Sequence, residues 1–195
     1  MTNAKILSGM ASGVLIMFFF GCWWLAIALP DMRHIPFWLE GIAIAVAATV
    51  MAGVGIIAGK VIRATRAGGA SSLTERSEGR KISRRLRWII VAEAAAICAA
   101  SFFLSRLQLQ RDILLGIALI VGLHFFPLAR VFGASEYYFT AIAGSLLAIA
   151  ALWVPVEPAR HVFLGFSMGF VLWATGLAVL YRAIHFKGAL RASAG

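Results

Sequence analysis

Glu93 and His124 are the side chains of this sequence best suited to chemistry, because each lies within a long apolar stretch. A carboxylate and an imidazole in contact can share a proton or hold a small polar ligand. Glu93 follows Arg87 by six residues, and His124 precedes Arg130 by six. At a helical rise of ~1.5 Å per residue, each lies about 9 Å from that basic residue. The spacing predicts that the two side chains lie at matching depth on neighbouring antiparallel helices.

Three interpretations of the Glu93–His124 pair are open at this point. The pair is a structural clamp that fixes the register of two helices, a proton-linked or ligand-binding site, or a coincidence without contact. In an apolar environment a lone carboxylate or imidazole lacks a polar partner, whereas a mutual hydrogen bond satisfies both groups. We therefore expect a contact, either direct or through one water molecule.

Pro127 adds a second local feature, three residues after His124. A proline inside a helix has no N–H, so the carbonyl of Leu123 loses its helical partner and the helix tends to kink. A kink at this point can open a small polar pocket. The sequence therefore predicts a kink beside the pair.

The composition places the chain among polytopic membrane proteins. Of its 195 residues, 62% are hydrophobic and only 13% are charged, which is more apolar surface than one soluble core of this size could bury. Charged and turn-forming clusters divide the apolar residues into six segments of the length that a bilayer requires. We expect these segments at residues 8–29, 37–59, 88–105, 113–129, 138–156 and 162–181.

The apolar segments predict helices, because only helices and closed barrels satisfy every backbone group in lipid and these runs do not alternate in polarity. The expected fold is all-α, a bundle of six transmembrane helices in three antiparallel hairpins. Residues 1–62 form the first hairpin, residues 63–87 a basic cytoplasmic linker, and residues 88–195 a four-helix unit with a short cytoplasmic tail. Small-xxx-small pairs recur at Gly9 and Gly13, Gly55 and Gly59, and Gly165 and Gly169, which favours close packing inside the molecule over a dimer face.

Lysines and arginines are distributed unevenly between the expected loops. Positive residues in short loops are retained on the cytoplasmic side. With the N-terminus inside, fourteen of the 18 basic residues are cytoplasmic, and those on the opposite face are Arg33, Arg106, Arg111 and Arg160. Both termini are therefore expected in the cytoplasm. No nucleic-acid-binding pattern accompanies the net charge of +10, so nucleic acid is not expected as a partner.

The expected linker reads RATRAGGASSLTERSEGRKISRRLR. It has no apolar periodicity to bury, which is typical of a flexible segment, and its far end could form an amphipathic approach to the third helix. Its basic residues favour contacts with membrane lipids that carry anionic headgroups. The alternative is a docking site for an acidic protein partner or a regulatory loop, and the sequence specifies neither a partner nor a homo-oligomer.

A short corner, RVFGASEYY, connects the fourth and fifth expected helices on the cytoplasmic side. Arg130 and Glu136 flank its Gly-Ala-Ser turn, and we expect Glu136 to pair with Arg130 or with the basic linker. Tyr137 and Tyr138 are expected at the membrane interface as amphipathic anchors. An exposed ion pair of this kind contributes only about 0–1 kcal/mol to stability.

The stretch IALIVGLHFFPLARVFGASEYYFTAIAGSLLAIAAL resembles an uncharacterised family of small bacterial inner-membrane proteins. Members of this family carry a similar Gly-Leu-His-Phe-x-Pro-Leu-Ala-Arg stretch, followed by a short gap and an aromatic pair. The resemblance covers about residues 78–155, and the matching residues are Glu93, Gly122, His124, Pro127, Arg130, Tyr137 and Tyr138. It implies a membrane fold in a bacterial inner membrane and implies no activity.

The scarcity of polar residues in the spans limits the functions to consider. A sugar or ion permease would line its path with more than one acid and one histidine. An enzyme would need a nucleophile with a base, or clustered metal ligands, and we expect no catalytic residue, metal or cofactor. The function we expect is a transport-like or sensing role for a small solute or proton at Glu93 and His124. The alternative is a non-catalytic structural or accessory subunit of a membrane complex.

Overall fold

A computed structural model describes residues 3–32, 45, 48–57, 59–60, 63, 73–155 and 157–192. All regular structure in these residues is helical, as predicted. Five helices are long and apolar enough to cross a membrane, namely Gly13–Asp31, Arg80–Arg106, Gln110–Phe132, Ser135–Trp153 and Pro158–His185. They correspond to five of the six expected segments. The second expected segment lies partly outside the described residues, and its described part contains the shorter apolar helix Ala48–Ile57.

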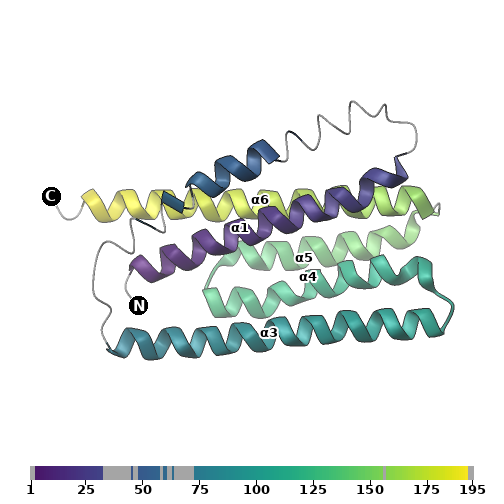
Figure 1. Cartoon of the computed structure of the whole chain (residues 1–195), viewed down its shortest axis with the longest axis horizontal. Helices are drawn as coiled ribbons and strands as arrows, with labels where there is room; N and C mark the ends of the chain where they lie inside the picture. The colour runs from purple at the N-terminus through teal and green to yellow at the C-terminus, as the bar shows by residue number, and fades with distance from the viewer. Residues whose placement is uncertain are drawn as a thin grey trace.

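The five long helices run along the long axis of the molecule (Figure 1). They are α1 (Asn3–Ala28), α3 (Leu73–Arg106), α4 (Ile113–Phe132), α5 (Ser135–Ala150) and α6 (Glu157–Ala192), and the turns η1 (Leu29–Asp31), η2 (Gln110–Asp112) and η3 (Ala151–Trp153) extend three of their ends. α1 packs on α6, α6 on α5, α5 on α4 and α4 on α3. α3 therefore lies at one edge of the bundle, in contact mainly with α4.

Glycines allow α1 and α6 to approach closely. A Cβ atom on Gly165 would lie 2.5 Å from Ala28 Cβ and 2.6 Å from the Trp24 carbonyl oxygen. A Cβ atom on Gly169 would lie 3.0 Å from the Gly21 carbonyl oxygen. The prediction that Gly165 and Gly169 pack inside the molecule is confirmed.

Large apolar side chains fill the space around this crossing. Phe18 stacks on Trp173 with ring centroids 6.0 Å apart, and the Trp173 indole N–H donates to the Phe18 carbonyl oxygen at 3.2 Å. The largest fully buried side chains are Phe18, Leu164, Met168, Leu172, Val14, Val179 and Thr140. Because lipid tails are as apolar as these side chains, close van der Waals packing is the main force that holds such helices together in a membrane.

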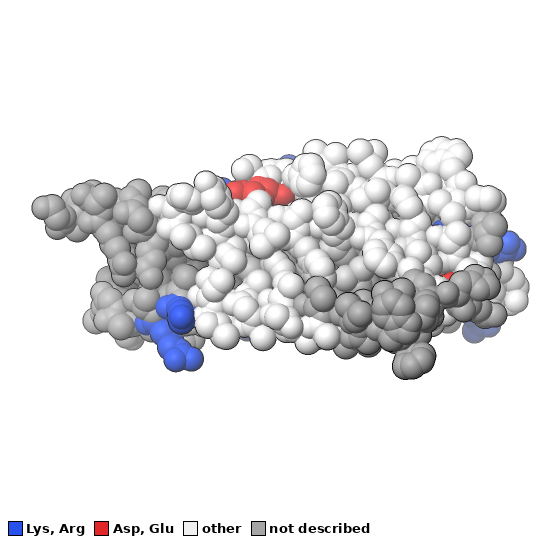
Figure 2. Space-filling view, turned by 90° about the horizontal axis from the view of Figure 1, so that it is seen from above, with Lys and Arg blue, Asp and Glu red and all other residues white. Residues whose placement is uncertain are grey.

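The outside of the bundle is also mostly apolar. Trp88, Phe102, Phe103, Trp153 and Phe170 are each more than half exposed. The face of the molecule in Figure 2 is mostly uncharged along its middle, and its Lys and Arg atoms lie mainly toward the two ends. Soluble proteins rarely expose so much contiguous apolar surface. The surface is that expected of a multi-pass membrane protein.

α3 begins at Leu73 rather than near residue 88, where the sequence predicted the third helix to begin. Residues 73–87 are therefore helical and not flexible, which agrees with the expectation that the far end of the linker could form an approach to the third helix. Residues 64–72 lie outside the described residues. The physical reason is that leucine, glutamate, lysine and arginine are good helix formers. Ile82 and Leu86 also continue the helical spacing of Ile89 further along α3, so the apolar periodicity passes through the expected boundary.

Candidate functional site

Glu93 on α3 and His124 on α4 are brought together by the fold. Glu93 Oε1 lies 3.1 Å from His124 Nδ1, so the predicted direct contact is confirmed. The Glu93 and His124 side chains are 20% and 17% exposed. The pair therefore lies at the seam between the edge helix and its neighbour, and not in the centre of the bundle.

The periodicity of α3 explains why Glu93 faces α4. The partly buried residues of this helix recur every three or four positions, at Ile82, Leu86, Ile89, Glu93, Ile97, Ala100, Ser101 and Leu104. This spacing defines one face of an α-helix. Near the far end of the same face, Leu104 Cδ1 would lie 3.2 Å from a Cβ atom on Gly116 of α4. Glu93 thus occupies a place in an otherwise mostly apolar seam, where it needs a polar partner.

The His124 ring makes a second polar contact. Its Nδ1 lies 3.0 Å from the Val121 carbonyl oxygen on the preceding turn of α4. Because a carbonyl oxygen can only accept, Nδ1 carries the hydrogen in this bond. Glu93 Oε1 lies 3.1 Å from the same nitrogen, so the carboxylate is an ion-pair neighbour of the ring while the N–H donates to Val121. Nε2 is then the ring nitrogen that is left to take up a proton.

Aromatic rings connect His124 to the buried core. The ring centroids of His124 and Phe125 are 4.6 Å apart, and those of Phe125 and Tyr137 are 6.0 Å apart. Phe125 and Tyr137 are 6% and 3% exposed. The pair therefore has packed aromatic side chains on its inner side, which restrict the conformations open to the imidazole ring.

The Tyr137 side chain is buried inside the bundle and does not face lipid, which contradicts its predicted role as an amphipathic anchor. Its hydroxyl oxygen would lie 2.7 Å from a Cβ atom on Gly13 of α1, in the core. α5 begins at Ser135, which places Tyr137, Thr140 and Ala141 on its buried face. Tyr138 is one position further round the helix and is 38% exposed, as expected for an interfacial anchor.

Pro127 lies inside α4, and the helix continues through it to Phe132. The residue lines a shallow, open groove between α3 and α4. Glu93 and His124 are not among the residues that line this groove. The groove at Pro127 is mainly apolar and does not include the pair, so it is not a polar pocket of the kind that a kink beside His124 could open.

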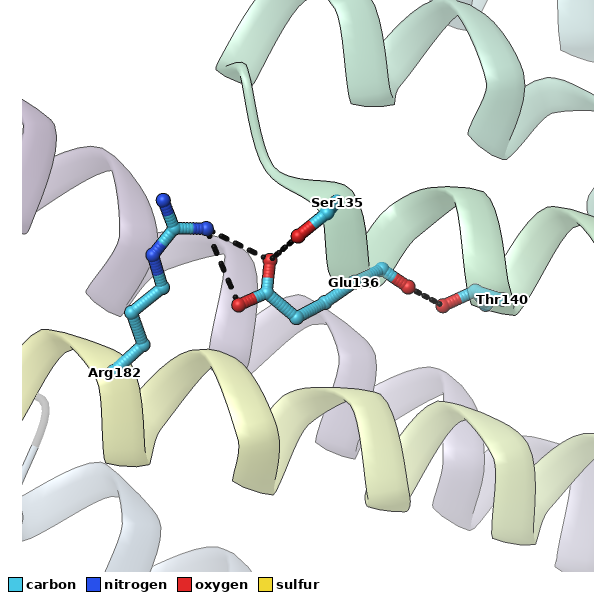
Figure 3. A network of polar contacts seen from close by, with 4 residues as sticks. All are labelled: Ser135, Glu136, Thr140 and Arg182. Carbon is cyan, nitrogen blue, oxygen red and sulfur yellow. Dashed lines mark hydrogen bonds and ion pairs between the residues drawn. The ribbon is translucent and has the colours of Figure 1, made fainter.

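Glu136 pairs with Arg182 of α6, whereas the sequence predicted Arg130 or the basic linker as its partner. Arg182 Nη1 donates to Glu136 Oε2 at 3.0 Å and to Oε1 at 3.2 Å (Figure 3). Arg130 lies instead on the side of α4 that faces α3, where it lines the groove. One turn further along α5, the Thr140 and Thr175 hydroxyl oxygens lie 2.6 Å apart in a buried hydrogen bond between α5 and α6. Together these contacts fix α5 on α6.

Glu136→Gln is expected to lower the free energy of unfolding by no more than about 1 kcal/mol, because exposed ion pairs contribute little. The Arg182 side chain is 46% exposed, which screens the pair. Thermal unfolding in detergent measures the effect, and Arg182→Gln should give a similarly small change. A loss of folded protein in either variant would show that the pair is shielded from solvent.

A second polar cluster, at the opposite end of the bundle, was not predicted as a set of contacts. His161 Nδ1 lies 2.7 Å from Asp31 Oδ2, and Arg160 Nη1 lies 2.8 Å from Asp112 Oδ1. Arg160 Nε also donates to the Val154 carbonyl oxygen at 3.2 Å. These contacts tie the start of α6 to three other helix ends. The signal was present in the sequence, because the expected topology places all these residues on one side of the membrane.

Within the described part of the chain, no three His, Cys, Asp or Glu side chains lie close enough together to hold a metal ion. The buried polar residues described there are Thr140 and Thr175. Glu93 and His124 are side chains that can each gain or lose a proton. Comparison of the chain with models of protein families, with curated proteins and with solved structures found no match.

Proposed function

We propose that this membrane protein senses protons, with Glu93 and His124 as the sensing site and α3 as the helix that responds. The observation that carries the proposal is the 3.1 Å contact between Glu93 Oε1 and His124 Nδ1. This contact joins the edge helix to the rest of the bundle. A proton gained or lost by the pair therefore acts directly on the packing of α3.

Sensing fits the geometry better than transport of a small solute. A transport path needs polar groups through the centre of a bundle, whereas the described core around α1, α5 and α6 is apolar apart from Thr140 and Thr175. Glu93 and His124 lie at the seam of the edge helix. A sensing site at this seam needs proton access from one side only, and no path that crosses the membrane.

Two protonation states of the pair differ in how strongly they hold α3. With hydrogens on both ring nitrogens, His124 is a cation beside the Glu93 carboxylate, and the contact is an ion pair. When Nε2 loses its proton, a neutral ring faces the carboxylate and the attraction weakens. α3 packs mainly on α4, so few other contacts oppose its displacement. Toward the basic end of this seam, Arg85 and Arg130 line the adjoining groove.

The test is a distance measurement between spin labels as the pH is changed. The native Cys98 on the exposed side of α3 takes one label and Phe170→Cys on α6 takes the other, in a protein that carries Cys22→Ser. We expect the distance to increase as the pH is raised and the pair loses its proton.

Two variants make the experiment specific. Glu93→Gln removes the carboxylate charge and should abolish the response, while Glu136→Gln removes a carboxylate far from the seam and should preserve it. A distance that does not change with pH in the protein with Glu93 and His124 intact would contradict sensing. It would favour the second candidate function, a structural or accessory subunit in which the pair is a clamp. That alternative is supported by the absence of Glu93 and His124 from the lining of the groove.

We further propose a bacterial inner-membrane location with six spans in three hairpins and both termini in the cytoplasm. Support comes from the basic loops and from the arrangement of the helices. The start of α1, the start of α3, the α4–α5 turn and the end of α6 all lie toward one end of the molecule (Figure 1). Reporter fusions at residues 75 and 195 should be active only with a cytoplasmic reporter. A signal from a periplasmic reporter at either position would contradict this orientation.

A further inference from the structure

A groove of ≈ 490 Å³ lies open on the outside of the bundle between α3 and α4. It is lined by Arg85, Trp88, Ile89, Phe126, Pro127, Arg130 and Val131. Two guanidinium groups, one from each helix, thus border a wall that is otherwise apolar. The groove is separate from the Glu93–His124 contact, so its role does not depend on proton sensing.

The two arginines lie where each helix passes from apolar to charged sequence. On α3, Arg84, Arg85 and Arg87 come directly before Trp88, and the apolar run follows. On α4, Arg130 follows the apolar run that contains Phe126. Tryptophan and arginine at such a boundary are typical of the headgroup level of a bilayer. The groove therefore extends from the headgroup level into the hydrocarbon.

The positive charge in the groove has no carboxylate partner among the described side chains. The ion pairs among the described side chains involve Glu93, Asp112, Asp31 and Glu136. None of them includes Arg85 or Arg130. Both arginines are exposed. An occupant that complements this groove must carry a negative charge at one end and an apolar chain at the other.

We propose that the groove binds one anionic phospholipid. Its phosphate lies between Arg85 and Arg130, whose guanidinium groups present paired N–H donors that match phosphate oxygens. An acyl chain lies on the wall formed by Ile89, Phe126 and Val131. The site is specific because both helices contribute one arginine and part of the wall, unlike the general attraction of basic residues to an anionic membrane surface.

The experiment measures phospholipid binding to the full chain in detergent by native mass spectrometry. Phosphatidylglycerol is compared with phosphatidylcholine, which carries no net charge. We expect a preference for phosphatidylglycerol, and Arg85→Gln with Arg130→Gln should weaken its binding at least about thirtyfold, from the loss of two charge-assisted contacts to the phosphate. The matched control, Arg84→Gln with Arg87→Gln, removes two positive charges from α3 outside the groove and should weaken binding much less than the groove variant.

Two results would contradict recognition of the lipid charge by Arg85 and Arg130. One is equal binding of phosphatidylglycerol and phosphatidylcholine. The other is an equal loss of phosphatidylglycerol affinity in the groove variant and in its control, which would indicate general attraction to basic residues. Val131→Trp tests the wall independently, because it fills the groove and keeps both arginines. It should weaken phosphatidylglycerol binding, and unchanged binding would contradict the site. Glycerol phosphate should fail to displace the lipid, and displacement at matched concentration would assign the arginines to a free phosphate instead.

Discussion

Glu93→Ala and His124→Ala are each expected to lower the thermal stability of the protein in detergent. Each truncation leaves one polar group of the α3–α4 seam without its partner. The expected cost is about 1–3 kcal/mol if the remaining group is neutral and about 3–5 kcal/mol if it is charged. Part of each side chain is exposed, so we expect a loss of stability toward the lower of these ranges.

The double variant separates a true pair from two independent residues. If Glu93 and His124 satisfy each other, removing both should cost less than the sum of the two single losses. Cys98→Ala, an exposed position on the same helix, should leave stability nearly unchanged and serves as the control. Strict additivity of the two alanine substitutions would show that the 3.1 Å contact contributes no coupling.

The depth of the pair could be predicted from the sequence because the helical rise is set by backbone hydrogen bonds and does not depend on side chains. Whether the two side chains face each other depends on helix rotation. The sequence contained a signal for rotation as well, in the row formed by Ile82, Leu86, Ile89 and Glu93. That row was hidden because its first half lies in a stretch so basic that it resembled a linker.

The boundary of α3 was mispredicted because charge marks where a chain leaves the lipid, and not where a helix ends. The basic residues before Trp88 are compatible with helix, and α3 extends through them to Leu73. The apolar spans of the other helices were easier to locate, since turns such as the one at Gly133, with φ of 62°, interrupt both the helix and the apolar run.

The partner of Glu136 could not be predicted from local sequence. Arg130 is near it in the chain, whereas Arg182 is 46 residues away and reaches Glu136 only because α5 and α6 pack antiparallel. The same reason applies to His161 and Asp31, which are separated by 130 residues. The local sequence does not show which charged helix ends meet, because this depends on how the helices pair.

Gly165→Ala is expected to destabilise the protein by about 1–3 kcal/mol, the usual cost of overpacking a close contact. The added Cβ would lie 2.6 Å from the Trp24 carbonyl oxygen and 2.5 Å from Ala28 Cβ. The first of these atoms belongs to the backbone, so α1 and α6 must move apart to admit the methyl group. Thermal unfolding in detergent measures the loss.

Gly53→Ala is the matched control for Gly165→Ala, because no described atom lies within 4 Å of a Cβ at Gly53. In a helix this change should be neutral or stabilising by up to about 1 kcal/mol. Equal tolerance of both substitutions would contradict the close crossing of α1 and α6. Gly165 lies away from the α3–α4 seam and shares no partner with Glu93, so the losses from Gly165→Ala and Glu93→Ala should add. If the losses from Gly165→Ala and Glu93→Ala add, while those from Glu93→Ala and His124→Ala are coupled, α3 is held by its own contact, independently of the α1–α6 core. This independence is what a response of α3 to a proton requires.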